Sequence, residues 1–206
     1  LSLIMSASGP LEWPSDLLDF QKDGIQVLVE RPSVLLADDM GLGKTVQAAA
    51  AMRLLAIRGE LERILVVAPA AVLRNWRDEL GKWAPELRVL EITGSQAQRA
   101  WKWDARVHVK VVRYETLRSD HLRVTNRHGQ WDIVCLDEAQ RIKNSGSAIS
   151  GVVRSIQSRR RWALTGTPLE NSLEDVRSIL SFLQPVRPPM GGVLKSLPIG
   201  GTDDGG

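Results

Sequence analysis

One stretch of the chain has the residue types and the spacing of a phosphate-binding loop. It spans residues 36–45 and reads Leu-Ala-Asp-Asp-Met-Gly-Leu-Gly-Lys-Thr. An apolar run precedes it and a predicted helix follows it, so backbone N–H groups and the positive end of a helix dipole would meet at one point. There Lys44 would contact the β- and γ-phosphates of a nucleotide, and the Thr45 hydroxyl would ligate Mg²⁺. Because Asp38 replaces the first glycine of the usual pattern, an ordinary Gly-rich turn is the alternative.

A second stretch ends an apolar run in two adjacent carboxylates, Asp137 and Glu138. Downstream of a phosphate-binding loop, the first carboxylate is expected to hold Mg²⁺, and the second to orient or deprotonate the attacking water. This chemistry requires mainly charge around the γ-phosphate and a positioned nucleophile. The alternative is a helix N-terminus, where acidic residues favour the helix dipole.

A third stretch, Thr165-Gly166-Thr167, also follows an apolar run. Its short hydroxyl side chains suit hydrogen bonds to the acidic pair or to a phosphate, although a simple polar turn would look the same.

Alternating strands and helices are predicted to position these residues. The first helix is expected to be capped by Ser15-Asp16 and to end at Arg31-Pro32, and the last to begin at Ser172 with Asp175 in a capping box. Strands rich in Val, Ile and Leu that alternate with helices predict an α/β fold, a mostly parallel sheet with helices on both faces. Ligands then bind at the carboxyl ends of the strands. Strands are expected at 33–37, 64–68, 88–92, 108–112, 131–136 and 161–164, and the other helices at 45–58, 72–83, 96–103 and 147–157.

The composition is that of a globular, intracellular protein without a membrane span. The 206 residues are 43% hydrophobic and 25% charged, the net charge is +3, and no apolar run approaches membrane-spanning length. The single cysteine, Cys135, lies in a predicted core strand and excludes a disulfide framework. Residues 1–10 and the Gly/Pro-rich residues 186–206 are expected to be tails around one domain at 11–185.

Six segments, in order, resemble the motifs of the first RecA-like lobe of Swi/Snf-type DNA translocases, within helicase superfamily two. In this family an acid occupies the first glycine position of the phosphate-binding loop, as Asp38 does here, and many members carry His where this chain has Gln140. The six segments are residues 20–24, 38–47, 68–76, 114–117, 137–144 and 164–171.

The resemblance implies a single RecA-like lobe of the P-loop NTPase class, in a DNA-dependent ATPase that uses ATP and Mg²⁺ and translocates on double-stranded DNA. The resemblance assigns catalytic roles to Lys44, Asp137 and Glu138, and the binding of Mg²⁺ to Thr45 and Asp137. The residues expected to bind the nucleotide are Gln21, which would read the adenine, and Asp39, Met40, Gly41, Leu42, Gly43, Lys44 and Thr45. Those expected to contact DNA or to couple it to the cleft are Pro69, Arg74, Trp76, Thr116, Gln140, Lys143, Asn144, Thr165, Gly166 and Thr167.

The expected DNA contacts include one tryptophan with two possible roles and one further basic run. Trp76 would stack on a DNA strand or, alternatively, pack in the core, because its predicted helix has apolar partners. The basic run Arg159 to Arg161 is expected to add contacts to DNA phosphates.

The family's second lobe supplies an arginine finger, and nothing after Pro185 resembles that lobe. This chain alone is therefore expected to bind ATP without DNA-stimulated turnover. The alternatives are a non-catalytic ATP- or DNA-binding module and a strand-separating superfamily two helicase, against which residues 40–43 and 142–144 argue. The excess of Arg over Lys favours the bacterial cytoplasm, at the nucleoid, with the nucleus as the alternative.

Overall fold

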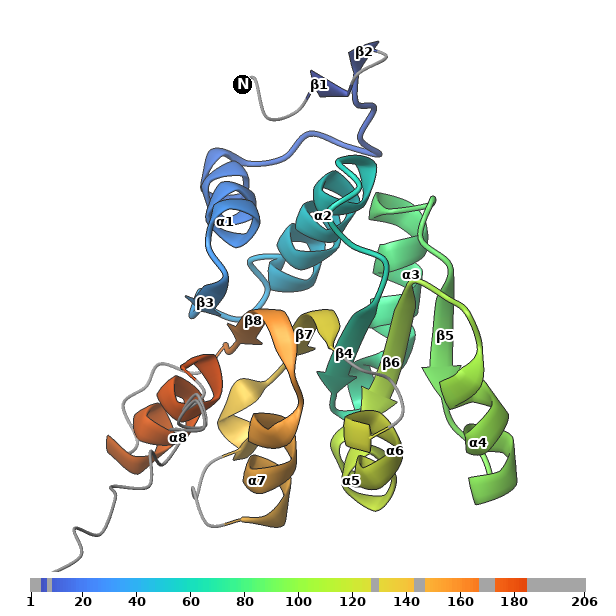
Figure 1. Cartoon of the computed structure of the whole chain (residues 1–206). Coiled ribbons are helices and arrows are strands. Elements are labelled where there is room, and N and C mark those ends of the chain that lie inside the picture. The colour runs from blue at the N-terminus through green and yellow to red at the C-terminus, as the bar shows by residue number, and fades with distance from the viewer. Residues whose placement is uncertain (1–4, 7–8, 127–129, 143–146, 167–172, 185–206) are drawn as a thin grey trace, which may run out of the picture.

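Six parallel strands form the centre of the fold (Figure 1). The structure is a computed structural model, and it describes residues 5–6, 9–126, 130–142, 147–166 and 173–184. The sheet order is β3-β8-β7-β4-β6-β5, and each neighbouring pair is parallel. The strands are β3 (Ser33–Leu36), β4 (Ile64–Ala68), β5 (Val89–Ile92), β6 (Val109–Arg113), β7 (Trp131–Leu136) and β8 (Ser158–Leu164).

Helices cover both faces of this sheet, as predicted. One apolar cluster contains Ile64 and Val66 of β4, and the other contains Leu65 and Val67, because successive side chains of a strand point to opposite faces. The first cluster packs under α1 (Asp19–Glu30), α2 (Lys44–Ile57) and α3 (Leu73–Trp83). The second packs under α4 (Gln96–Asp104), α5 (Tyr114–Ser119), α6 (His121–Asn126), α7 (Ala148–Ser155) and α8 (Leu173–Leu183).

Helix α2 is buried along most of its length, including four consecutive alanines at 48–51 that are fully inaccessible. A helix that is apolar on all sides belongs in the interior, where small side chains allow close packing. The first residue of α2 is Lys44, so this buried helix fixes the end of the phosphate-binding loop.

The predicted strands are confirmed to within a few residues, whereas two short helices and one helix start differ from the prediction. Helices α5 and α6 were not expected, because six residues are too few to show a helical period. Helix α1 begins at Asp19 and not at Ser15-Asp16, since the Gln21 side chain accepts a hydrogen bond from the N–H of Leu18 over 3.1 Å.

Two very short strands lie near the N-terminus, and two 3₁₀ turns follow strands of the main sheet. Residues expected to form an N-terminal tail include a small antiparallel pair, β1 (Met5–Ser6) and β2 (Gly9–Pro10). Short 3₁₀ turns, η2 (Ala70–Val72) and η3 (Ala139–Ile142), follow β4 and β7. Ser172 of the predicted capping box and the predicted tail at 186–206 lie outside the described residues. Cys135 is buried in β7, as expected. No described helix is both long and apolar enough to cross a membrane.

Candidate active site

Four neighbouring strands of the sheet carry the suspected motifs at one edge. In sheet order β3, β8, β7 and β4 are adjacent, and all are parallel, so their carboxyl ends meet at this edge. The residues after these four ends are, respectively, the P-loop (residues 38–45), Thr165, Asp137 and Pro69. A cleft of about 430 Å³ opens there, and the predicted residues that line it are Met40, Gly41, Gly43, Lys44, Thr45, Asp137 and Glu138.

The P-loop folds around the ammonium group of Lys44. Gly41 and Gly43 have φ angles of 83° and 75°, in the left-handed region that a glycine adopts without strain. The Nζ of Lys44 donates to the carbonyl oxygens of Asp38 and Asp39 over 2.7 and 2.8 Å. The loop thus holds a positive charge at the start of α2, next to the positive end of that helix.

Two glutamines brace the P-loop, and only one of them was predicted. The amide of Gln21, on α1, donates to the carbonyl of Leu42 over 3.3 Å, so it lies against the loop, and its role at the adenine stays a prediction. The amide of the buried Gln47 donates to the Asp38 carboxylate over 3.1 Å. An acid at the first glycine position therefore has a partner inside the lobe, and Asp38 belongs to the framework of the loop.

Asp137 is a largely buried carboxylate that is held by two donors. One oxygen accepts from Nε1 of Trp76 over 2.7 Å, and the other accepts from the N–H of Glu138 over 2.9 Å. Burial raises the pKa of Asp137, and these two hydrogen bonds oppose that shift. A buried carboxylate of this kind favours a nearby cation, which fits the predicted role at Mg²⁺.

The charges that line the cleft also fit a divalent cation. Lys44 is the one cation among the described residues of the lining, against the three carboxylates of Glu79, Asp137 and Glu138. A polyphosphate would add further negative charge, so Mg²⁺ would offset a repulsion that a single lysine leaves uncompensated. Among the described residues no group of three or more His, Cys, Asp or Glu is placed to hold a metal ion.

A chain of hydrogen bonds links the acidic pair to the turn after β8. The Thr165 hydroxyl donates to Oε1 of Gln140 over 2.8 Å, and Nε2 of Gln140 donates to the Glu138 carboxylate. Glu138 has φ of 49°, a left-handed conformation that costs a non-glycine residue about 1–3 kcal/mol and that clusters at functional sites. The expected contact between Thr165 and the acidic motif is therefore present.

The glycine of the same turn packs against the P-loop. A Cβ on Gly166 would lie 2.8 Å from Cγ of Met40 and 3.3 Å from Nζ of Lys44, so a larger residue would have to displace these two side chains of the loop. The turn after β8 thus contacts both the acidic motif and the P-loop. Thr167, Lys143 and Asn144 lie outside the described residues.

Helix α3 supplies cleft residues that were not predicted. Asn75 and Glu79 line the cleft, and one carboxylate oxygen of Glu79 is buried without a hydrogen-bond partner among the described residues. Their spacing of four residues placed them on one helix face, but the sequence did not show which face meets the P-loop.

Tyr114, at the start of α5, was also not predicted to contact the site. It donates its hydroxyl to the carbonyl oxygen of Asp137 over 2.7 Å.

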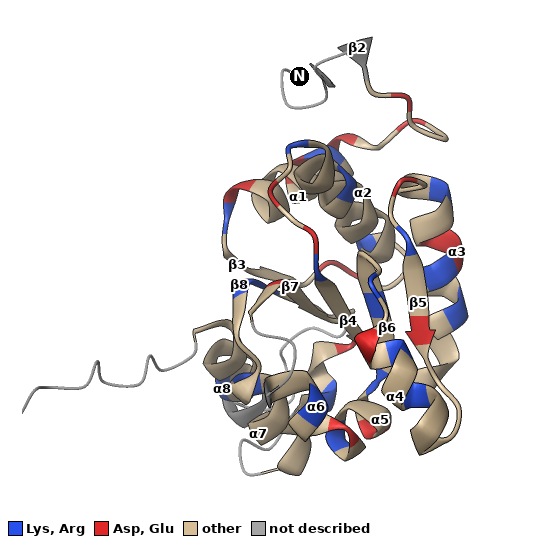
Figure 2. Ribbon diagram, turned by 45° about the vertical axis from the view of Figure 1, so that its right-hand side comes forward, with Lys and Arg blue, Asp and Glu red and all other residues tan. Residues whose placement is uncertain are grey.

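Three residues expected to contact DNA or to couple it to the cleft are buried. Trp76 is fully inaccessible and donates to Asp137, so the predicted packing in the core is confirmed and the alternative, stacking on a strand, is wrong. Pro69 and Thr116 are also buried, which argues against direct contact with a strand, while a coupling role for them stays a prediction. Arg74 differs, because 86% of its side chain is exposed on α3, where Figure 2 shows basic and acidic residues interspersed.

Two of the three residues of the Arg159 to Arg161 run serve the framework, whereas 66% of the Arg159 side chain is exposed and its predicted contact with a DNA phosphate stays a prediction. These residues belong to the start of β8, at the edge of the sheet opposite to the cleft. Arg160 donates to the carbonyl of Val29 over 2.8 Å, and the buried Arg161 donates to the carbonyl of Phe182 over 3.0 Å. Burial lowers the pKa of Arg161 to about 10. Arg159 lies 3.5 Å from the Asp132 carboxylate.

Comparison with known proteins connects this arrangement to one family. The family model of the SNF2-related domain matches residues 20–187. The chain is 36% identical over 186 residues to the chromatin-remodeling ATPase INO80 of Arabidopsis thaliana, which covers 82% of this chain and 12% of that protein. It is 38% identical over 182 residues to a chromodomain-helicase-DNA-binding protein 1-like of Danio rerio, covering 82% of this chain and 17% of that protein.

A solved structure has the same fold. The SWI2/SNF2 ATPase core of Sulfolobus solfataricus in complex with dsDNA matches with a TM-score of 0.76 and 34% identity, over 84% of this chain and 37% of that chain. This chain therefore spans a minor part of the length of each of these relatives. Because the family model matches most of its residues, the chain belongs to the SNF2-related domain family.

Proposed function

We propose that this lobe binds Mg-ATP and forms the nucleotide-binding half of a DNA-dependent ATPase that translocates on double-stranded DNA. The observation that carries the proposal is the single cleft shared by Lys44, Thr45, Asp137 and Glu138. The names of the relatives, chromatin-remodeling ATPases and a SWI2/SNF2 core in complex with dsDNA, support the same function.

In this proposal each residue acts from the position described above. Lys44 and the backbone N–H groups of the P-loop bind the β- and γ-phosphates. Thr45 and Asp137 hold Mg²⁺, which neutralises charge on the phosphate oxygens when bound. Glu138 orients the attacking water and accepts its proton, and Gln140 fixes the Glu138 carboxylate.

Coupling to DNA would run through the turn after β8. Thr165 binds Gln140, and Gly166 packs on the P-loop, so a displacement of this turn would reach both the water-orienting acid and the phosphate site. Arg74, whose side chain is 86% exposed on α3, would meet a DNA phosphate. The location of the protein, in the bacterial cytoplasm or in the nucleus, stays a prediction. The relatives named above come from a plant, a fish and an archaeon and do not decide between the two.

A specific observation favours a second candidate, a lobe that binds ATP without turning it over by itself. Lys44 alone is cationic in the described lining of the cleft, so the additional transition-state charge would come from a second RecA-like lobe. In nucleotidases an arginine finger is worth about 10³–10⁵ in rate. We therefore expect nucleotide binding by this polypeptide and DNA-stimulated hydrolysis only with a second lobe.

The test is calorimetric titration of the 206-residue protein with Mg-ATP, followed by phosphate release with and without duplex DNA. Lys44→Ala should abolish binding, whereas Arg58→Ala, which removes an ion pair with Glu60 at the other end of α2, should leave it unchanged. Unchanged affinity in Lys44→Ala would contradict the proposed site. DNA-stimulated turnover above a Glu138→Gln control would contradict the need for a second lobe.

A further inference from the structure

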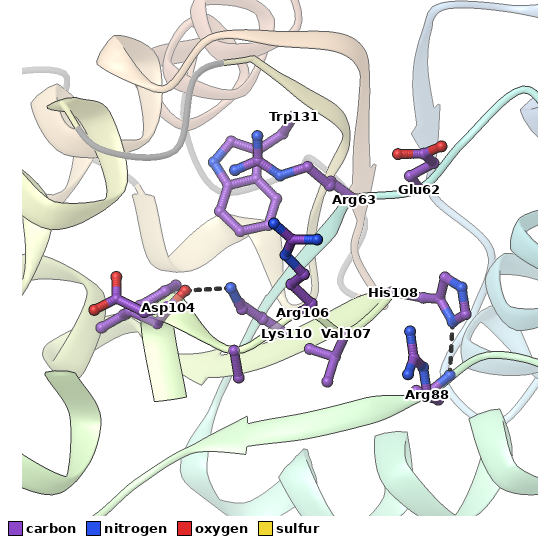
Figure 3. Close-up of a pocket in the computed structure, with 11 residues that line it drawn as sticks. Glu62, Arg63, Arg88, Asp104, Arg106, Val107, His108, Lys110 and Trp131 are labelled. Atoms are coloured by element: carbon purple, nitrogen blue, oxygen red, sulfur yellow. Dashed lines mark hydrogen bonds between the residues drawn. The ribbon is translucent and has the colours of Figure 1, made fainter. Parts of the chain in front are cut away.

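A second hollow, of about 750 Å³, lies at the opposite edge of the sheet (Figure 3). Arg63, Arg88 and His108 immediately precede β4, β5 and β6, and Trp131 begins β7, so the four residues mark the amino ends of four neighbouring strands. The nucleotide cleft is at the carboxyl ends. A five-residue strand such as β4 separates the two edges by roughly 17 Å. The hollow is therefore distinct from the nucleotide cleft.

The lining of this hollow carries a surplus of positive charge. Four cations, Arg63, Arg88, Arg106 and Lys110, face two carboxylates, Glu62 and Asp104, which leaves a formal charge of +2 with His108 neutral. Within the described part of the chain, none of the four cations forms an ion pair with a carboxylate. We name these four cations and Trp131 the basic pocket.

Lys110 forms the floor of the basic pocket. Only 5% of the residue is exposed, and its ammonium donates to the carbonyl of Trp103. The Trp131 ring carries two cations, since its centroid is 5.0 Å from the Arg63 guanidinium carbon and 5.9 Å from Nζ of Lys110. Burial and then the Arg63 charge lower the pKa of Lys110 to about 8, while Asp104 opposes the shift. The fold thus holds a desolvated cation beside a second cation.

The side chains converge on one space. Figure 3 shows Arg63 lying across the Trp131 ring and Arg106 extending toward that ring, while the Lys110 ammonium is directed at the carbonyl oxygen of Trp103, and all three side chains line the same hollow. An anion in this space would receive charge-assisted hydrogen bonds and would offset the repulsion between the cations. Guanidinium groups match the oxygens of phosphate in a fork geometry, and a phosphate dianion matches the formal surplus.

We propose that the basic pocket binds the phosphate group of a small anionic ligand, with Lys110 at its floor and Arg63 and Arg106 as lateral donors. The volume lies in the range of small-ligand sites. A DNA backbone fits less well, because a duplex would meet the exposed Arg88 and Arg106 at the rim but would not reach the recessed Lys110. This proposal is independent of the function proposed for the nucleotide cleft.

The test uses inorganic pyrophosphate as the probe and the 206-residue protein carrying Lys44→Ala, so that the P-loop does not contribute. Titration calorimetry without Mg²⁺ should show one binding site. Lys110→Met and Arg63→Gln should each weaken binding by a factor of about ten or more. The matched control is Lys82→Met, because Lys82 also lies over a tryptophan ring, at 5.7 Å from Trp83, but is absent from the lining of the pocket, and it should change nothing.

Two results would overturn the proposal. The first is the absence of pyrophosphate binding, or binding that Lys110→Met and Arg63→Gln leave unchanged while thermal melts show both variants folded. The second is a pair of observations: duplex DNA binds with an affinity that depends on Arg88 and Arg106, and pyrophosphate does not bind. This pair would show that the rim of the pocket binds DNA. Binding of Mg-ATP by the protein with Lys44 intact should be the same in Lys110→Met, which separates this proposal from the nucleotide cleft.

Discussion

The indole Nε1 of Trp76 lies 2.7 Å from a carboxylate oxygen of Asp137 and donates a hydrogen bond to it. Trp76 is fully inaccessible, and its neighbours Leu73 and Leu80 on α3 are buried in the same apolar cluster, so packing fixes the direction of the indole N–H. The bond joins a helix that follows β4 to the carboxylate that follows β7. Trp76 is therefore a positioning residue for the proposed Mg²⁺ carboxylate.

Trp76→Phe should weaken the binding of ATP in the presence of Mg²⁺ and leave Mg²⁺-free binding unchanged. The variant keeps an aromatic ring in the core but removes one hydrogen bond to a charged group, worth about 1.5–3 kcal/mol, or roughly tenfold or more in affinity. Calorimetric titrations with ATP, in Mg²⁺ and in a chelator, separate the two quantities.

The matched control for this prediction is Trp162→Phe. Trp162 is equally inaccessible, and its Nε1 has no hydrogen-bond partner among the described residues, so the substitution removes the same ring volume without removing a hydrogen bond. An equal loss of Mg²⁺-dependent affinity in both variants would mean that Trp76 acts only through packing.

Two helical glycines should respond to alanine in opposite directions. A Cβ on Gly24 would clash with Oε1 of Gln47, a fully buried side chain whose amide donates to Asp38 of the P-loop. Gly24→Ala should therefore destabilise the fold by about 1–3 kcal/mol through overpacking. A Cβ on Gly81 would meet nothing within 4 Å, so Gly81→Ala should stabilise α3 by about 0.5–1 kcal/mol. Urea unfolding measures both, and the same sign for both would contradict the argument.

Much of the fold followed from the apolar strands, because a run such as Ile64–Ala68 has no polar face and must lie inside a parallel sheet. The placement of the P-loop, Asp137 and Thr165 at one edge followed from the same reasoning. The partners of individual side chains did not. The apolar spacing around Trp76 indicated burial but gave no sign that its N–H meets Asp137, which comes from a distant strand.

The arginine run shows the opposite limit. Arg159 to Arg161 look like a solvent-exposed basic patch in the sequence, yet Arg161 is buried because carbonyl oxygens at the ends of α7 and α8 accept its hydrogen bonds. Only the arrangement of helix ends around the start of β8 shows which arginines face solvent. A charge run in the sequence therefore does not by itself predict a nucleic-acid surface.

Thr165→Val should separate binding from coupling. The variant keeps the shape of the side chain but removes the hydroxyl that donates to Gln140 over 2.8 Å, so Gln140 loses one constraint on its orientation toward Glu138. ATP affinity should stay within about twofold, since Thr165 is absent from the lining of the cleft. In a two-lobe protein that carries this lobe, DNA-stimulated hydrolysis should fall by about 10–10². Thr165→Ser should restore it, and equal rates for Val and Ser would contradict a role for the hydroxyl.

Lys110→Met should stabilise the protein at neutral pH, and the gain should disappear at high pH. Burial lowers the pKa of Lys110 from its ordinary value of 10.5 to about 8. Between these values the unfolded chain binds more protons than the folded one, so the stability of the natural protein rises as the pH increases through this window. Below about pH 8 the folded state carries the full cost of the buried charge, and above about pH 10.5 it carries none. Methionine removes the cost at every pH but also removes the hydrogen bond to the Trp103 carbonyl, so the net gain near pH 7 should be on the order of 1–3 kcal/mol.

Urea unfolding of both proteins from about pH 7 to pH 10, at one ionic strength, measures the difference in the free energy of unfolding, in which other titrating groups cancel. A difference that stays constant over this range would show that Lys110 is not titrating in the folded protein as its burial requires.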